Sequence, residues 1–367
     1  MHDTQYVFDV SRLINRNIKK RRMTGVDNVL VGFISGFSKK YNFFFRFKIF
    51  FFIFSEKSTE YIFKKISSEQ KISKVILFCL CIANIFYTFI KIIFKHKYYF
   101  NLGHSGLDNS FHIFASSLIS KKRVVLIHDL IPIKFPEYSI PNEDKRHEKR
   151  LKNIIQISDK IILNSEITRK QFKDWLARHN YDFSSLDMKV IKPVSSLNFQ
   201  LSKKRKYYCM VGTIEPRKGY MEILNLFLEA TDPPFPLIII GQEGWMCDDE
   251  IKLLQNLSKI NKLTWYNDCS NKDLEKILSN SKGLIQNSST EGFGIPIIEA
   301  LDNGLEVFIK KSKDIEIFNN SGVNYYKNIN ELQSILKKHE INEFINSSNH
   351  RNTWFDASRE LYEFIEK

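Results

Sequence analysis

The stretch Thr290-Glu291-Gly292-Phe293-Gly294-Ile295-Pro296-Ile297-Ile298-Glu299-Ala300 decides both the fold and the candidate site of this chain. It follows an apolar run, 283–286, that predicts a buried strand, and Pro296 suits the first position of a helix. A strand, a glycine loop and a helix N-terminus predict a pocket of backbone N–H groups that suits an anion such as phosphate. Glu291 and Glu299 border this pocket and suit sugar hydroxyls. The pattern predicts a nucleotide-sugar site; the alternative is a capping loop with two solvated glutamates.

A second stretch, Val211-Gly212-Thr213-Ile214-Glu215-Pro216-Arg217-Lys218-Gly219, places two adjacent cations after a predicted strand and before a predicted helix. Arginine can hold a phosphate through two hydrogen bonds, and lysine supplies a compact charge. A leaving nucleoside diphosphate develops negative charge in the transition state, which cations already in position stabilise. Arg217 and Lys218 are therefore candidate diphosphate-binding residues; the alternative is an exposed basic turn.

The composition indicates a two-domain globular protein. The chain has 367 residues, of which 43% are hydrophobic, so a sizeable core is available. Its five cysteines are odd in number and lack zinc-ligand spacing, which favours a reduced, cytosolic compartment. The net charge is +14, and residues 1–100 alone contain 18 Lys/Arg against 6 Asp/Glu. Because this basic region has no nucleic-acid-binding signature and is rich in Phe and Ile, it favours an anionic membrane surface; the alternative is a solvated basic face.

Apolar and amphipathic runs alternate along the chain and predict strands and helices of a doubly wound α/β fold. Expected strands cover 6–10, 43–54, 98–102, 124–127, 160–163, 207–211, 237–240, 263–266, 283–286 and a last one at 307–309. Expected helices cover 24–37, 144–157, 168–178, 220–230, 250–260 and 273–278, and residues 16–22 are expected to form a basic loop. Residues 195–206 are the expected interdomain linker. We expect an N-terminal domain (1–195), a C-terminal domain (196–350) and a closing helix (351–367) that packs back on the first.

Residues 75–94 are the one candidate membrane-spanning segment, but Asn84, Thr88 and Lys91 interrupt it. We expect a helix that is partly buried in the domain or lies in the membrane interface, with a true span as the alternative. The first ten residues do not have the pattern of a signal peptide.

The two quoted stretches resemble those of retaining GT-B glycosyltransferases of family 4, most closely the bacterial enzymes of O-antigen and capsule synthesis. Supporting segments are 8–13, Thr24-Gly25-Val26-Asp27, His128-Asp129-Leu130-Ile131-Pro132, 240–245 and 354–361. The resemblance implies two Rossmann-like domains that face a cleft. It also implies that the reaction proceeds on one face of the sugar and that the leaving diphosphate takes the acceptor proton, with no metal and no cofactor.

The resemblance assigns roles residue by residue. Arg217 and Lys218 would hold the diphosphate, Glu291 the sugar hydroxyls and Glu299 the ribose. His128 would reach the sugar and the acceptor, although a lone histidine at a strand end is often structural and Asp129 can be a loop-capping residue. Further donor-binding residues would be Gly25, Gly212, Thr213, Gly241, Gly292, Phe293, Gly294 and Ile295. His104 is a weaker candidate, and Asn164-Ser165 is more simply a helix cap.

We therefore predict a cytoplasmic glycosyltransferase at the inner membrane. It would transfer a hexose, with mannose or rhamnose favoured, from a nucleotide-diphosphate sugar to a lipid-linked oligosaccharide of a bacterial surface polysaccharide. The alternatives are a nucleotide-sugar 2-epimerase, which needs no acceptor, and a non-catalytic GT-B scaffold of a polysaccharide-assembly complex.

Overall fold

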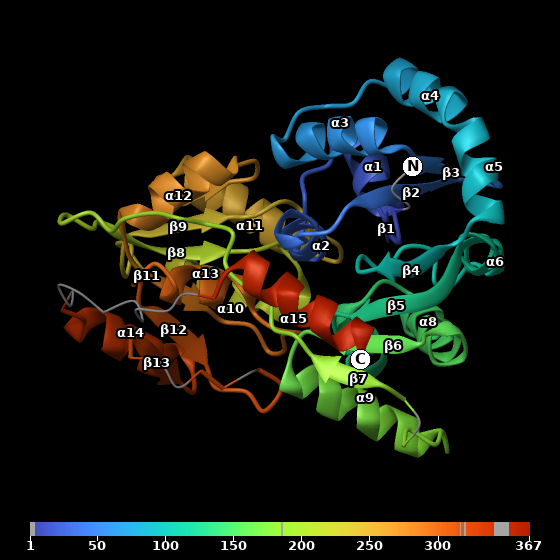
Figure 1. The fold of residues 1–367 in the computed structure, drawn as a ribbon. Coiled ribbons are helices and arrows are strands. Elements are labelled where there is room, and N and C mark those ends of the chain that lie inside the picture. Colours follow the sequence, from blue (N-terminus) through green and yellow to red (C-terminus); the bar gives the residue numbers. More distant parts are fainter. Residues whose placement is uncertain (1–3, 185, 316, 319–320, 341–351) are drawn as a thin grey trace. The chain divides into compact units, whose positions relative to one another are not determined.

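The computed structural model describes residues 4–184, 186–315, 317–318, 321–340 and 352–367 (Figure 1). The chain forms two units. Unit 1 comprises Met1–Leu130, Lys145–Pro193 and Thr353–Lys367, and unit 2 comprises Ile131–Asp144 and Val194–Asn352. The segment Ile131–Asp144, which we expected in the N-terminal domain, belongs to unit 2.

Unit 1 is built on a seven-stranded sheet of order β3-β2-β1-β4-β5-β6-β7. The β2–β3 pair is antiparallel, and the other pairs are parallel. The strands are β1 (Tyr6–Asp9), β2 (Tyr41–Phe47), β3 (Phe50–Phe54), β4 (His96–Asn101), β5 (Ser120–Ile127), β6 (Lys160–Leu163) and β7 (Met188–Val190). Every residue of β1 and β6 is buried, as expected of strands covered on both faces.

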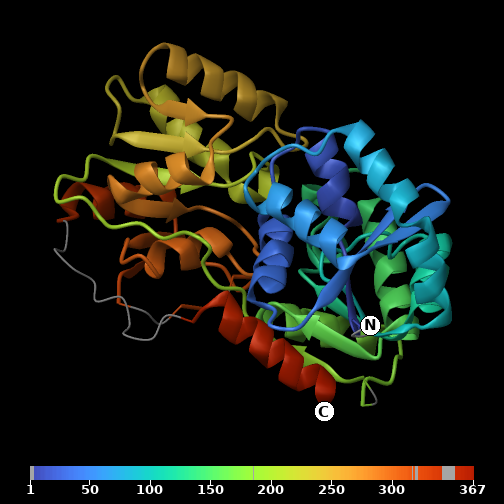
Figure 2. The same cartoon turned by 45° about the horizontal axis from the view of Figure 1, so that its top comes forward.

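Helices cover the two faces of this sheet, as Figure 2 shows from a second side. They are α1 (Ser11–Ile18), α2 (Gly25–Gly36), α3 (Glu56–Ser67), α4 (Lys74–Ala83), α5 (Ile85–Ile93), α6 (Ser110–Ile119), α8 (Glu143–Ile157), α9 (Glu166–Arg178) and α15 (Trp354–Glu366).

Unit 2 repeats this topology in an all-parallel sheet of order β10-β9-β8-β11-β12-β13. The strands are β8 (Tyr207–Val211), β9 (Leu237–Ile240), β10 (Thr264–Tyr266), β11 (Ser281–Gln286), β12 (Val307–Lys310) and β13 (Val323–Tyr326). The helices are α7 (Ile131–Lys134), η1 (Pro136–Tyr138), η2 (Pro216–Lys218), α10 (Tyr220–Glu229), α11 (Asp248–Lys259), α12 (Asn271–Ser279), α13 (Ile295–Leu301) and α14 (Ile329–Lys338). The prediction of two doubly wound α/β units is confirmed.

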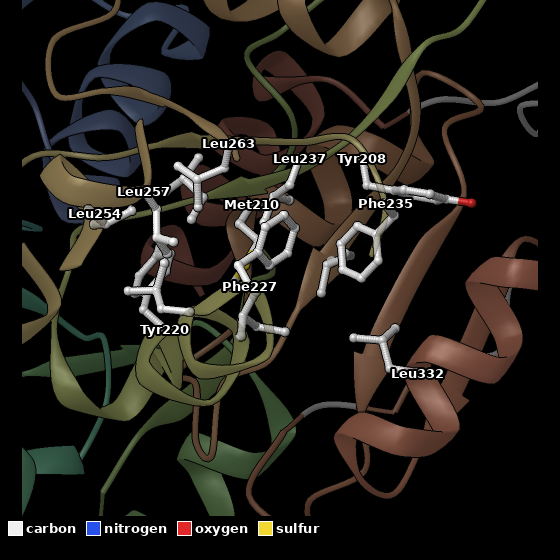
Figure 3. Packing of buried hydrophobic residues seen from close by; sticks show 14 of the residues in the cluster. Tyr208, Met210, Tyr220, Phe227, Phe235, Leu237, Leu254, Leu257, Leu263 and Leu332 are labelled. Carbon is white, nitrogen blue, oxygen red and sulfur yellow. The ribbon is translucent and has the colours of Figure 1, made fainter. Parts of the chain in front are cut away.

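Successive residues of the unit 2 strands alternate between two hydrophobic cores. Tyr208 and Met210 of β8 and Leu237 of β9 pack with Phe227 of α10 in one core (Figure 3). Cys209 of β8 belongs to the opposite core. This second core also contains Leu197 and Phe199, so the expected linker, 195–206, is partly packed onto the domain. Both faces of the sheet are therefore buried, as the near-continuous apolar strand sequences require.

Helix α15 packs against α2 in unit 1, and two glycines of α2 permit the close approach. A Cβ atom on Gly32 would lie 2.1 Å from the Trp354 ring, and one on Gly36 would lie 2.0 Å from the Trp354 carbonyl oxygen. The Ser358 hydroxyl also donates to the Phe33 carbonyl (2.9 Å). The closing helix is therefore part of unit 1.

Three local predictions are wrong. Residues 16–22 are not wholly a loop, because α1 runs to Ile18 and buries Leu13 and Ile14. Residues 43–54 form a hairpin rather than one strand, and Lys48 provides the turn with φ 54°. Strand β13 lies beyond the last expected strand and extends the sheet by pairing with β12.

The candidate span, 75–94, forms two short helices, α4 and α5, rather than one. Among the described residues no single helix has the length and hydropathy to cross a membrane, but this pair passes that test when taken together. The two helices meet at a bend of 47°.

Candidate active site

The two sequence stretches that predict the site converge where the strand order of the unit 2 sheet reverses. Arg217 and Lys218 lie in η2, in the loop after β8, and Glu291 lies in the loop after β11. Strands β8 and β11 are neighbours in the sheet. Ligands of open α/β sheets bind beyond the carboxyl ends of the strands at this kind of reversal.

The carboxylate of Glu291 joins these two loops. The Arg217 Nη1 atom donates to Oε2 at 2.7 Å, and the Lys218 Nζ atom donates to Oε1. Oε1 also accepts hydrogen bonds from Gln286 Nε2 (2.6 Å) and Ser288 Oγ (2.7 Å). In this structure Glu291 therefore orients the two cations. The predicted contact of Glu291 with a sugar is not tested by these interactions.

The cluster contains two cations, Arg217 and Lys218, and two carboxylates, Glu215 and Glu291, and all four side chains are largely buried. Arg217 Nη2 contacts Glu215 Oε1 at 2.6 Å, so the guanidinium lies between two carboxylates. Burial by itself would raise the pKa of Glu291, but Arg217 and Lys218 lower it to about 2. Glu291 is therefore ionised at neutral pH, and it fixes the cations before any anionic ligand arrives.

A left-handed glycine lets the two loops touch. Gly219 has φ 65°, and a Cβ atom there would lie 2.5 Å from the Asn287 carbonyl oxygen. The Asn287 amide donates to the Gly219 carbonyl (2.7 Å), and the Ser289 N–H donates to the Arg217 carbonyl (2.8 Å). These bonds hold the cation-bearing loop against the Glu291 loop.

Gly212 and Gly241 bring two strand ends together. A Cβ atom on Gly241 would lie only 1.9 Å from the Gly212 carbonyl oxygen, which accepts a hydrogen bond from the Tyr220 hydroxyl (2.8 Å). The Thr213 methyl group lies beside Gly244, 2.7 Å from where a Cβ atom would stand. Close backbone packing therefore accounts for the presence of glycine at positions 241 and 244. Donor binding by Gly212, Thr213 and Gly241 stays a prediction.

The loop before α13 has a buried anchor and a left-handed cap. Phe293 is buried with its ring centroid 6.4 Å from that of Phe318, and Gly294 has φ 88° at the N-cap of α13. The helix begins at Ile295, so Pro296 occupies the second position rather than the predicted first. Backbone contacts from 292–295 to a donor stay a prediction.

Glu299 on α13 is 6% exposed and is not part of the Glu291 cluster. Burial, with a smaller effect of Asp302, raises its pKa to about 8. The part of the chain that the structure describes provides no hydrogen-bond partner for its carboxyl group. At neutral pH this group is mainly protonated, so it can both donate and accept hydrogen bonds.

Several functional contacts were not predicted from the sequence. Glu215, Gln286 and Ser288 contact Arg217 or Glu291. Glu215 lies inside the stretch 211–219 and Gln286 at the end of the predicted strand 283–286, but neither was named as a site residue. The Asp314 carbonyl accepts hydrogen bonds from the Glu291 N–H (3.1 Å) and the Thr290 hydroxyl (3.4 Å), and the Asp314 carboxylate pairs with Lys134. The acidic residue Asp314 and Lys134 are 180 positions apart, and no motif links them.

The Lys134–Asp314 pair attaches α7 to the Glu291 loop, so we expect Lys134→Met to destabilise unit 2. The Asp314 side chain is 7% exposed, whereas that of Lys134 is 36% exposed and is screened by water. The loss in unfolding free energy should therefore be about 1 kcal/mol. Urea unfolding measures it, with the exposed Lys313→Met as the control. Equal stabilities of the two variants would show that the pair does not stabilise the domain.

In unit 1, His128 follows β5 as a buried, neutral imidazole. Its Nε2–H donates to the Leu102 carbonyl at 2.8 Å. Burial lowers the pKa of His128, against the opposing effect of this hydrogen bond. The His104 ring centroid lies 5.1 Å away, and loss of hydration lowers the pKa of His104 well below its ordinary value. Because Nε2 carries the proton, Nδ1 of His128 is the nitrogen that can accept a hydrogen bond.

The predicted loop at Gly25 is the first turn of α2, held by a buried carboxylate. Asp27 accepts hydrogen bonds from the Thr24 N–H (2.8 Å) and hydroxyl (2.7 Å), and it pairs with Arg12 (2.7 Å) and Arg16 (3.0 Å). Donor binding by Gly25 stays a prediction.

The structure confirms the capping interpretation of Ser165, because its hydroxyl accepts a hydrogen bond from the Thr168 N–H (3.0 Å) at the start of α9. The Asp129 carbonyl accepts a hydrogen bond from His147 Nε2 (3.0 Å). These two groups therefore have structural contacts within unit 1.

Within the described ranges, no three His, Cys, Asp or Glu side chains are grouped so that they could hold a metal ion. The five cysteines are free thiols, of which Cys79 is exposed and Cys269 is half-buried.

Comparisons with known proteins agree with the predicted fold. Residues 195–360 match the family model described as "Glycosyl transferases group 1". The Escherichia coli serotype-specific mannosyltransferase WbdA is 29% identical over 214 residues, which are 53% of this chain and 26% of that protein. The E. coli O-antigen chain mannosyltransferase B is 25% identical over 51% of this chain and 52% of that protein. The Salmonella typhimurium O-antigen chain mannosyltransferase RfbU is 24% identical over 54% of each.

Two solved structures show the same fold over nearly the whole chain. Anabaena Alr3699/HepE, in complex with UDP and glucose, has a TM-score of 0.69 at 13% identity and covers 99% of this chain and 100% of that one. The sucrose-phosphate synthase of Thermosynechococcus elongatus has a TM-score of 0.56 at 13% identity and covers 98% of this chain and 94% of that one.

The two units have the GT-B fold, as the sequence resemblance predicted. The family match falls on residues 195–360, which contain Arg217, Lys218 and Glu291. The matched part spans about a quarter of WbdA and about half of the other two mannosyltransferases.

Proposed function

We propose that this protein is a retaining glycosyltransferase of bacterial O-antigen or capsule synthesis. It transfers a hexose, with mannose favoured over rhamnose, from a nucleotide-diphosphate sugar to a lipid-linked oligosaccharide. The observation that carries this proposal is the convergence of Arg217, Lys218 and Glu291 at the reversal of strand order in the family-matched domain. The mannosyltransferase names of the sequence relatives support the choice of sugar.

The cluster suits a diphosphate leaving group. Glu215 and Glu291 already hold Arg217 and Lys218, so little reorganisation is needed when negative charge develops on the departing diphosphate. In the proposed reaction this diphosphate accepts the proton of the acceptor hydroxyl, and no metal ion is required. Glu299, with its protonated carboxyl group, would hydrogen-bond to the ribose hydroxyls.

Unit 1 would provide the acceptor side of the reaction. The neutral imidazole of His128 suits a hydrogen bond from a substrate hydroxyl, since its Nε2–H is already bound to Leu102. We propose that the protein works on the cytoplasmic side of the inner membrane, where a lipid-linked oligosaccharide is accessible. The basic, aromatic first hundred residues support this placement.

Thermal unfolding in the presence of nucleotides tests the donor site. We expect one of GDP, UDP or dTDP to raise the melting temperature, because a ligand at 100 times its Kd stabilises the native state by about 2.7 kcal/mol. The shift should disappear in Arg217→Met and persist in Lys252→Met, whose side chain is 76% exposed. Inorganic pyrophosphate is the control for binding through phosphate charge alone. A shift that is equal in both variants would contradict the proposed diphosphate site.

Incubation with the identified nucleotide sugar separates the proposal from its two alternatives. Transfer to a lipid-linked acceptor supports the glycosyltransferase. Conversion of the donor without an acceptor would identify a 2-epimerase. If no combination of donor and acceptor gives either transfer or epimerisation, the scaffold would be favoured, whether or not the nucleotide sugar binds.

A further inference from the structure

Helices α4 and α5 turn their polar side chains toward the protein. They lie beside β3, the edge strand of the unit 1 sheet (Figure 1). The Thr88 hydroxyl accepts a hydrogen bond from the Ile53 N–H (2.9 Å), and the Asn84 side-chain carbonyl accepts one from the Ser55 N–H (2.8 Å). Asn84 and Thr88, two of the three residues that interrupt the apolar segment in the sequence, therefore cap backbone groups at a sheet edge, which would otherwise be open to pairing.

The opposite face of the same two helices is apolar and exposed. Phe86 is 76% exposed, Ile93 73% and Val75 72%. The outer face of this pair, which we call the α4–α5 face, comprises the exposed residues Val75, Ile76, Phe78, Ile82, Ile85, Phe86, Phe89 and Ile93. A surface helix of a globular protein normally points its apolar side chains to the core. This reversed arrangement indicates a face that is covered by an apolar environment.

The charges around this face favour an anionic partner. No Asp or Glu occurs between Glu69 and Asp108, whereas the same interval contains five lysines. Exposed lysines flank the face at both ends: Lys71 and Lys74 at the start of α4, and Lys95 after α5. An apolar face bordered by lysines and free of carboxylates matches a bilayer with anionic headgroups.

The geometry favours helices that lie on the bilayer. Helix α4 has 10 residues and α5 has 9, and they are bent by 47°. A span of the hydrocarbon core needs about 20 residues. A straight span would also have to remove Asn84 and Thr88 from the backbone groups of β3. We propose that the α4–α5 face is a membrane-docking surface that inserts its apolar side chains into the interface of an anionic bilayer. The docking surface rests on the proposed function, because it specifies which part of the protein contacts the membrane. Vesicle binding by this surface can nevertheless be measured without any glycosyl transfer.

Flotation of the full chain with vesicles tests this surface. The wild-type protein should float with vesicles of phosphatidylethanolamine and phosphatidylglycerol. The variant Phe78→Ser/Phe86→Ser/Phe89→Ser should bind at least tenfold more weakly, and because these side chains are exposed it should remain folded by circular dichroism. The control Leu228→Ser/Ile260→Ser removes exposed apolar residues of unit 2 and should bind like the wild type. Equal binding of the triple variant and the control would overturn the proposal.

A second variant tests the charge. Lys71→Gln/Lys74→Gln/Lys95→Gln should lose most of the preference for phosphatidylglycerol over phosphatidylcholine vesicles, and salt should weaken wild-type binding. A preference that survives both changes would overturn the assignment of an anionic surface.

Cys79 gives a direct readout, because it is the exposed cysteine and lies on α4. In a Cys269→Ser background, an environment-sensitive dye on Cys79 should shift its emission to the blue on addition of anionic vesicles. No shift despite flotation would place the contact elsewhere and overturn the proposal. Resistance to extraction by alkaline carbonate would identify a membrane span, and a dimer in solution that the triple variant abolishes would identify a self-association surface. Either result would replace the docking surface proposed here.

Vesicle binding and transfer fail independently. A protein that binds vesicles but transfers no sugar refutes the proposed function and leaves the docking surface standing. A protein that transfers sugar to a water-soluble acceptor but does not bind vesicles refutes the docking surface and leaves the glycosyl transfer standing.

Discussion

Arg217→Met should lower kcat/KM for sugar transfer by about 10³-fold, since removing one preorganised donor to a developing negative charge costs 10²–10³-fold or more. The guanidinium is held by Glu215 at 2.6 Å and Glu291 at 2.7 Å, so its orientation is fixed before the donor binds. Methionine retains an apolar stem of similar length and removes the charge. Initial rates with a nucleotide sugar and a lipid-linked acceptor measure the effect.

Two controls separate chemistry from folding in this experiment. Arg217→Lys retains the charge but cannot bridge both carboxylates, so its loss of activity should be intermediate. Lys252→Met on α11 removes an exposed charge of the same unit and should retain activity within about twofold. Because Arg217→Met leaves two carboxylates with fewer partners, its rates must be measured well below its melting temperature. Wild-type kcat/KM in folded Arg217→Met would refute the diphosphate role.

Glu299→Gln should stabilise the unliganded protein strongly at pH 8.5 and by only about 1 kcal/mol at pH 5.5. Burial raises the pKa of Glu299 from 4.5 to about 8 in the folded chain. The folded state therefore holds a proton that the unfolded chain releases, and the wild type loses stability as pH rises from about 4.5 to about 8. Glutamine has nearly the same shape and does not titrate. The gain at pH 8.5 should reach up to about 4 kcal/mol.

Urea unfolding of both proteins at the two pH values measures this difference. The exposed Glu229→Gln in the same unit is the matched control, and it should change the unfolding free energy equally at both pH values. If Glu299→Gln destabilises the protein equally at pH 5.5 and 8.5, the carboxyl group is not buried in its protonated form. Loss of nucleotide binding in the same variant would further support its proposed contact with the ribose.

The fold was predictable because its strands are apolar runs separated by amphipathic helices. Residues 160–163 and 237–240 form β6 and β9 with the predicted bounds. The hairpin at 41–54 was not predictable, because its turn residue Lys48 adopts a positive φ without a glycine or asparagine to signal it. Helix α1 was not predicted, because Arg16 and the basic residues after it indicated a loop, although the helix is stabilised by burying Leu13 and Ile14.

The candidate site was predictable where one short stretch contains the chemistry. Arg217, Lys218 and Glu291 were found because glycines and a helix start surround them, and the structure brings all three together. Lys134 was missed because its role depends on an ion pair with Asp314, a residue 180 positions away that no local sequence pattern connects to it. The sequence also indicated a role for Glu291 in sugar binding, whereas the contacts of its carboxylate with Arg217 and Lys218 form only when β8 and β11 pair.

The exchange of segments between the two units limits how the chain can be cut. The polypeptide passes between units after Leu130, Asp144, Pro193 and Asn352, so neither unit is one continuous piece of sequence. A fragment that starts at residue 194 would lack Lys134 and the Tyr138 carbonyl, to which the Trp245 indole donates at 2.7 Å. A fragment that ends at residue 193 would lack Trp354, and Gly32 and Gly36 of α2 would face water. Expression of either half for crystallography or domain swapping would therefore require a circular permutation or a grafted segment rather than a simple truncation.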